Sequence, residues 1–150
     1  MQISARTMYG LRALVTLAGA RTDEPMSIQT IAEEEELPGK FLEGIMADLK
    51  RGGFVRSKRG ASGGYFLERP ASEITLLSVI RHLEGPVAPM AYGDRTSGDG
   101  TPTDRQAAIR PVWQEIRDAT IRVLERYTIQ SIADSVPELV LEDFQPIYQI

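Results

Sequence analysis

Apolar residues recur at spacings of three and four along the N-terminal half of the chain, a period typical of amphipathic helices. The first repeat follows Ser4, a residue suited to cap a helix, and comprises Met8, Leu11, Val15 and Ala18. A second, shorter helix is expected to begin at Ser27 and to turn three residues inward: Ile28, Ile31 and Ala32. Its acidic end, Glu33 to Glu36, is expected to be a solvated helix end before Pro38 closes the turn.

The same period predicts a third helix from about Gly39 to Arg51. Its apolar face consists of Phe41, Leu42, Ile45, Met46 and Leu49, and its other face of Lys40, Glu43, Gly44 and Ala47. Glycine costs roughly 1 kcal/mol of helix propensity relative to alanine, so Gly44 needs an explanation. Close packing against another helix and close approach to DNA both explain it, and the sequence leaves the two open.

A basic, glycine-rich hairpin is expected directly after this helix, which Gly52 and Gly53 end. Residues 54–67 read as two short strands joined by a turn that holds three glycines, Gly60, Gly63 and Gly64. Three basic side chains, Arg56, Lys58 and Arg59, are placed where DNA phosphates would lie. The order predicts a mainly α fold with a small β-hairpin wing, a winged helix-turn-helix whose third helix enters a major groove.

Charge is distributed unevenly along the 150 residues. The net charge of the chain is −4, but residues 40–69 carry seven Lys or Arg against three acids, net +4, and residues 70–150 are net −5. A local basic surface joined to an acidic module favours a defined DNA contact over general polyanion binding. No run approaches the roughly 18 apolar residues of a membrane span, and Arg6 and Arg12 interrupt any signal peptide, so we expect a soluble cytoplasmic protein.

An ordered series of motifs carries a family resemblance. The series begins with the run from Tyr9 to Leu14 and continues with Lys40-Phe-Leu-Glu43, Leu49, the run from Gly53 to Gly60, Gly63-Gly64-Tyr65, Ile74-Thr-Leu, Val79-Ile80, Glu84-Gly85, Trp113 and Thr128-Ile. Over residues 3 to about 135 the chain resembles the Rrf-type transcriptional regulators, the group that includes IscR, NsrR and CymR.

The resemblance implies a homodimer with two winged-helix heads, each reading half of a near-palindromic operator in double-stranded DNA. It places Lys40 and Glu43 at base-reading positions and Arg59 at a minor-groove position of the wing tip. A carboxylate can accept from cytosine N4, and arginine suits a narrow minor groove. The alternatives are that Glu43 is an ordinary acidic residue on a helix surface and that Arg59 is a solvated residue of a turn. Gly44, Gly63 and Gly64 are expected to allow close approach to DNA.

Three segments are expected: a DNA-binding head (1–84), a loop rich in Gly, Pro, Ser, Thr and Asp (85–103), and a dimerisation helix with a tail (104–150). Many members of the resembled family hold an iron–sulfur cluster with three cysteines of that loop, and this chain has no cysteine. Tyr92, Ala107 and Arg110 fall near the ligand places. Cluster ligation depends on thiolates, so we expect no cluster, cofactor or metal.

Other candidates for sensing are weak in the sequence. The single histidine, His82, lies in a helix expected over Leu76 to Leu83 and is more often a surface or packed residue than a ligand. Three loop aspartates, Asp94, Asp99 and Asp104, miss the spacing of a calcium loop.

Arg110-Pro111 is expected to start a helix of about 16 residues, or ~24 Å. Its apolar seam, which predicts a dimerisation face, consists of Val112, Ile116, Ala119 and Val123. The alternative is that this helix packs only on its own head. The apolar tail from Pro137 to Ile150 is expected to dock on the dimer or, less favoured, on another protein.

Three functions compete. The favoured one is a cluster-free, sequence-specific transcriptional regulator of repressor type, controlled by a small-molecule effector or a partner protein, although the sequence does not establish the sign of regulation. The alternative is a protein-interaction module that binds a metabolic enzyme or another partner, with DNA binding secondary. An enzyme is disfavoured because there is no phosphate loop, no cysteine and no paired carboxylates set by a motif.

Overall fold

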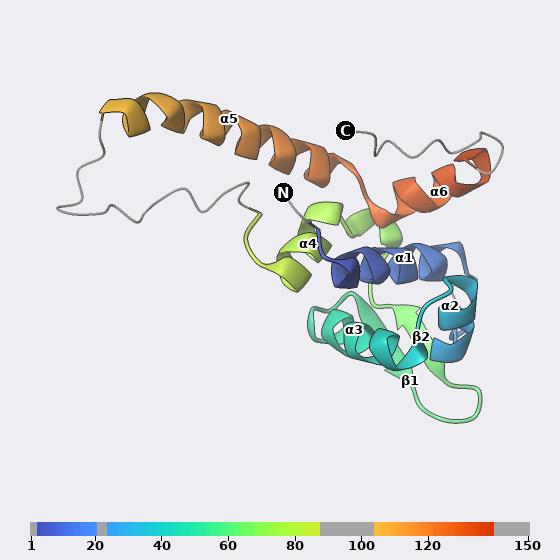
Figure 1. Ribbon diagram of the computed structural model, residues 1–150. Helices are drawn as coiled ribbons and strands as arrows, with labels where there is room; N and C mark the ends of the chain where they lie inside the picture. Colours follow the sequence, from blue (N-terminus) through green and yellow to red (C-terminus); the bar gives the residue numbers. More distant parts are fainter. Residues whose placement is uncertain (1–2, 21–23, 88–103, 140–150) are drawn as a thin grey trace.

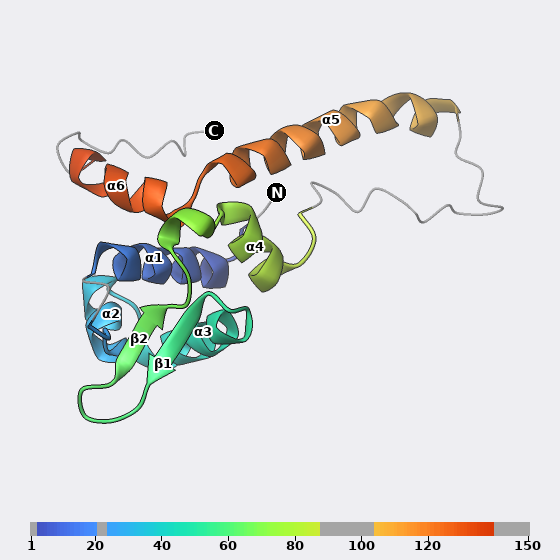
Figure 2. The same ribbon diagram turned by 180° about the vertical axis from the view of Figure 1, so that it is seen from behind.

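The computed structural model describes residues 3–20, 24–87 and 104–139 of the chain. Its helices are α1 (Ala5–Gly19), α2 (Ile28–Glu34), α3 (Gly39–Arg51), α4 (Leu76–Glu84), α5 (Asp104–Arg126) and α6 (Ile129–Leu139). The strands are β1 (Val55–Lys58) and β2 (Gly64–Leu67), an antiparallel pair. This order confirms the predicted winged helix-turn-helix, and the hairpin extends from the head at the end opposite α5 (Figures 1 and 2).

The core of the head lies where α1, α3 and α4 meet. Its fully buried large side chains include Leu14, Ile31, Leu42, Ile45, Met46, Leu49 and Ile80. Each such burial is worth about 1.5–3 kcal/mol, so this cluster holds α3 firmly on α1. The inward placement of Ile31 and of four of the five predicted apolar residues of α3 is confirmed.

Local signals in the sequence set the helix ends as predicted. Ser4 Oγ accepts from the N–H of Thr7 at 3.2 Å, and Ser27 Oγ accepts from the N–H of Thr30 at 3.0 Å, so both serines cap the helices that follow them. Gly52 is the C-cap of α3. α4 extends to Glu84, one residue beyond its predicted end.

Two predicted inward placements are wrong. Met8 and Phe41 are each 44% exposed, because α1 buries Leu14 and Leu17 and Phe41 lies at the edge of the apolar face of α3. The acidic end of α2 is not wholly solvated either: the Glu35 side chain is 19% exposed and pairs with Arg12 of α1. Periodicity identifies a face but not which neighbours cover it.

The expected start of the long helix is also wrong, since α5 begins at Asp104 and contains Pro111. A proline removes one backbone hydrogen bond, yet helix continues on both sides of it here. In Figure 1, α5 is the long orange helix whose N-terminal part extends away from the head.

The helix α6 is not among the predicted elements, and it packs across α1 of the head. The Leu76 N–H donates to the Tyr127 carbonyl at 3.0 Å and the Ile129 N–H to the Ile74 carbonyl at 2.9 Å. These two bonds tie the junction of α5 and α6 to the start of α4. Among the described helices, none is both long and apolar enough to cross a membrane.

Candidate nucleic-acid interface

One face of α3 is exposed to solvent in the part of the chain that the structure describes. Lys40, Glu43, Gly44 and Ala47 are all exposed, whereas Leu42, Ile45, Met46 and Leu49 on the opposite face are buried. A Cβ built on Gly44 would meet no atom within 4 Å beyond its own helix backbone, in the part of the chain described. Close helix packing therefore does not explain Gly44, and the exposed face is smooth where a partner surface would approach.

The C-terminal end of α3 is held by a cluster of polar contacts around Asp48. Its carboxylate pairs with Arg6 of α1 and with Arg51 of α3. Its backbone carbonyl lies 2.7 Å from His82 Nε2, and because a carbonyl can only accept, that nitrogen carries the proton. His82 is thus an exposed residue bonded to α3, in agreement with its interpretation as a surface or packed residue. Sequence reasoning missed Arg6 and Asp48, whose contact spans 42 positions and leaves no local pattern.

The His82 ring lies close to Gly52. A Cβ on Gly52 would lie 2.7 Å from His82 Nε2 and 2.6 Å from the Phe54 ring, so a larger residue there would require these rings to shift. The Phe54 and His82 rings lie 5.4 Å apart, and the Arg69 guanidinium lies 5.1 Å from the Phe54 centroid. This stack joins the start of the wing to α4.

The wing presents the predicted basic residues to solvent. Arg56, Lys58 and Arg59 are all exposed, and Arg56 stacks over its cross-strand partner Phe66 at 4.4 Å. Lys50 of α3 donates to Ser57 Oγ of β1 at 2.6 Å, a contact that sequence reasoning missed. Lys50 therefore links the C-terminal end of α3 to β1 of the wing.

Two wing glycines have a structural reason of their own. A Cβ on Gly63 would lie 2.4 Å from the Lys58 carbonyl oxygen, and one on Gly64 would lie 2.4 Å from the Met26 carbonyl oxygen. Met26 forms a β-bridge with Tyr65, with N–H to O distances of 3.0 and 2.8 Å. The expected DNA contacts of Gly63 and Gly64 stay predictions, since backbone packing already accounts for both. Gly60, with φ 115°, confirms the predicted positive φ of the turn.

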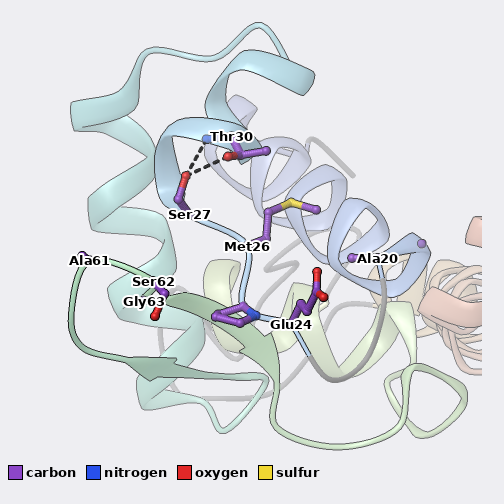
Figure 3. Close-up of a pocket in the computed structure, with 10 residues that line it drawn as sticks. Ala20, Glu24, Met26, Ser27, Thr30, Ala61, Ser62 and Gly63 are labelled. Carbon is purple, nitrogen blue, oxygen red and sulfur yellow. Dashed lines mark hydrogen bonds between the residues drawn. The ribbon is translucent and has the colours of Figure 1, made fainter.

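A pocket of about 690 Å³ lies between the wing tip and the start of α2 (Figure 3). It is lined by Gly19, Ala20, Glu24, Pro25, Met26, Ser27, Thr30, Ala61, Ser62 and Gly63. The Ser27 hydroxyl accepts from the Thr30 N–H and also bonds the Thr30 hydroxyl, so the hydroxyls on the α2 side are already engaged. The lining indicates no particular ligand class.

Along α5 an apolar stripe faces solvent. Val112, Ile116 and Val123 are 52%, 40% and 48% exposed, and Ala119 between them is half-buried. Ile109, 45% exposed, extends the stripe beyond the expected helix start. Ile121 and Leu124 instead pack against the core of the head. Within the described ranges, Val112, Ile116 and Val123 of the seam are thus apolar side chains exposed on one copy of the chain.

Some candidates for sensing lie outside the described part of the chain. These are Tyr92, Asp94, Asp99 and the side chains of Asp104 and Ala107. Arg110 is exposed on α5. Within the ranges that the structure describes, no group of three or more His, Cys, Asp or Glu side chains is placed to hold a metal ion.

Comparison with known proteins gives matches over most of the chain. The family model Rrf2, which carries the description "Iron-dependent Transcriptional regulator", matches residues 3–135. The HTH-type transcriptional regulator CymR of Bacillus subtilis is 35% identical over 133 residues, 89% of this chain and 90% of CymR.

Solved structures agree. That of CymR, called the global cysteine regulator of B. subtilis, has a TM-score of 0.78 at 34% identity, covering 91% of this chain and 98% of that chain. T. potens IscR has a TM-score of 0.72 at 27% identity, covering 99% and 97%. The matches extend beyond the head to the long helix.

Proposed function

Because the chain belongs to the Rrf2 family of transcriptional regulators and is a winged-helix DNA-binding regulator, we propose that it acts as a homodimer that reads a near-palindromic operator without an iron–sulfur cluster. The observation that carries this proposal is the exposed face of α3. It offers Lys40, Glu43 and the open surface of Gly44 beside a basic wing, while its other face is locked into the core.

Each exposed residue has a distinct proposed role. Lys40 and Glu43 contact base edges in the major groove, where a carboxylate accepts from cytosine N4. Arg56 and Lys58 neutralise phosphates and fix the register of the head. Arg59, at the wing tip, enters the minor groove, whose negative potential is greatest where the groove is narrow.

The apolar stripe of α5 supports the dimer. Its exposed side chains recur at three and four residues on an otherwise charged helix, a spacing that suits pairing with a second copy. Leaving such a stripe in water costs free energy that pairing recovers. The tie between the α5–α6 junction and α4 would then fix each head relative to the dimer axis.

The ligand set for a cluster is absent from the sequence. The family description names iron, but this chain has no cysteine, and alanine and arginine at 107 and 110 offer no thiolate. The residues do not fit a thiolate-bound cluster. A small-molecule effector or a partner protein is therefore the signal that we propose.

We further propose that the chain represses by occupying its operator, that it acts in the cytoplasm where the DNA lies, and that it catalyses no reaction. The family consists of regulators, which supports the last point. Turnover of any metabolite in a screen with the purified chain would contradict it.

Light scattering and selection of bound genomic fragments test the proposal together. We expect a dimer, and enriched sites with two half-sites about one helical turn apart, roughly 34 Å, or a multiple of it. Val123→Glu should shift the protein towards monomer, because it places a charge in the stripe, whereas Arg122→Glu next to the stripe should not. A monomeric wild type without enriched fragments would overturn the proposal.

A further inference from the structure

Arg12 of α1 clamps the turn between α2 and α3. Its Nε donates to Glu35 Oε2 at 2.6 Å, and a terminal nitrogen donates to the Glu35 backbone carbonyl at 2.5 Å. The other carboxylate oxygen accepts from the Thr16 hydroxyl of α1. A planar guanidinium that bonds a side chain and a backbone group together fixes an orientation that a lone ion pair would not.

The same guanidinium is also connected to α3, which follows the turn, through two aromatic rings. It lies over Tyr9 at 6.0 Å from the ring centroid, and Tyr9 meets Phe41 edge to face, with centroids 5.8 Å apart at 88°. Phe41 stands in the first turn of α3, next to Lys40. Arg12 therefore contacts the chain before the turn directly and the chain after it through Tyr9.

The N-terminus of α3 lacks the side-chain cap that α1 and α2 have. Its N-cap is Pro38, which provides no side-chain cap hydrogen bond. Glu36, just before, holds a positive φ of 53°, a conformation that costs free energy for a residue other than glycine. Within the turn, Leu37 donates to the Ala32 carbonyl at 2.8 Å and is buried. Contacts with α1, together with the burial of Leu37 and Leu42 in the core, therefore restrain where the first turn of α3 lies.

We propose that Arg12 is a positioning residue for base discrimination: through Glu35 on one side and Tyr9–Phe41 on the other, it fixes the first turn of α3. It thereby fixes the positions of Lys40 and Glu43. The inference rests on the proposed function, which assigns these two residues to the base edges. A misplacement of about 1 Å at a recognition group is enough to lose much of its effect. Arg12 acts without touching a base.

The test compares wild type with Arg12→Lys, Glu35→Gln and the double variant. Lysine keeps the positive charge but lacks the planar guanidinium that bonds two groups at once. Non-specific DNA binding and its salt dependence should therefore not change. For each protein, dissociation constants are measured on an operator obtained by selection and on a duplex with the Glu43-dependent base pair replaced. We expect each single variant to reduce discrimination between the duplexes about tenfold, and the double variant to be no worse than either.

Two further variants separate positioning from a general loss of structure. Arg12→Lys combined with Glu43→Ala should discriminate no worse than Glu43→Ala alone, because both changes act on one contact. Arg81→Lys, at an exposed arginine of α4, is the matched control and should leave discrimination unchanged.

If Arg12→Lys bound both duplexes more weakly by the same factor, or discriminated between them as well as wild type does, the inference would be overturned and the proposed function would stand. A wild-type protein that does not discriminate at all would overturn the proposed function, and the inference with it.

Discussion

Replacement of Gly44 by alanine should strengthen the fold and weaken DNA binding at once. A Cβ at this position enters open space on the exposed face of α3, so nothing opposes the gain in helix propensity. That gain is about 0.5–1 kcal/mol. For a chain of this size it corresponds to a rise in melting temperature of about 1–4 °C.

The opposite effect on binding follows from the same open space. If DNA closes over α3, the added methyl group lies between the helix and the groove, and such overpacking costs about 1–3 kcal/mol. That is about a 5- to 150-fold loss of affinity. Urea or thermal unfolding at one fixed protein concentration measures the first effect, and fluorescence anisotropy with a selected operator measures the second.

Gly10 provides the matched control, since it is also a helical glycine but a packed one. A Cβ there would lie 2.9 Å from Leu83 Cδ1 and 3.3 Å from Ile45 Cγ2, so the propensity gain should be cancelled or reversed. Stabilisation of Gly44→Ala with undiminished operator affinity would refute the reasoning that DNA approaches α3 at this point. If Gly44→Ala were less stable than wild type, the claim that a side chain at position 44 enters open space would be refuted.

Three further outcomes are expected. Lys58→Ala should reduce the slope of log affinity against log salt by about 1 without changing base preference, in a titration of salt; a change confined to one base pair would contradict a phosphate contact. Gly64→Ala should destabilise the wing by about 1–3 kcal/mol in urea unfolding, because the new Cβ would overlap the Met26 carbonyl and break the bridge to Tyr65; unchanged stability would count against that packing. Hydrogen bonds from the Ser4 side chain, Thr7 and the Ser4 backbone lower the pKa of Glu84, so its contribution to stability is present above the ordinary carboxyl pKa and is lost as pH falls through the folded one. The difference in melting temperature between wild type and Glu84→Gln should therefore shrink below about pH 4, and a constant difference would contradict this.

Features set by neighbouring residues could be predicted from the sequence. The serine caps, the glycine end of α3 and the hairpin depend on residues a few positions apart, and the structure places each as expected. Features set by distant partners could not. Glu35 looks solvated until Arg12, 23 positions earlier, is placed beside it.

The start of α5 shows a different limit of prediction. Pro111 predicts the first turn of the long helix near this residue, because proline lacks an N–H and the N–H groups of a first helical turn have no partner within the helix. The helix nevertheless begins at Asp104, so Ile109 joins the exposed stripe that the sequence placed only from Val112 onward.

Parallel selection of random duplexes by wild type and by Glu43→Ala tests the central claim most directly, because it asks whether the exposed face of α3 reads bases. Wild type should enrich a near-palindrome, and Glu43→Ala should relax its preference at one base pair of each half-site by about 1–3 kcal/mol while keeping the others. Identical preferences for the two proteins at every position would contradict the claim that α3 reads the operator through this residue.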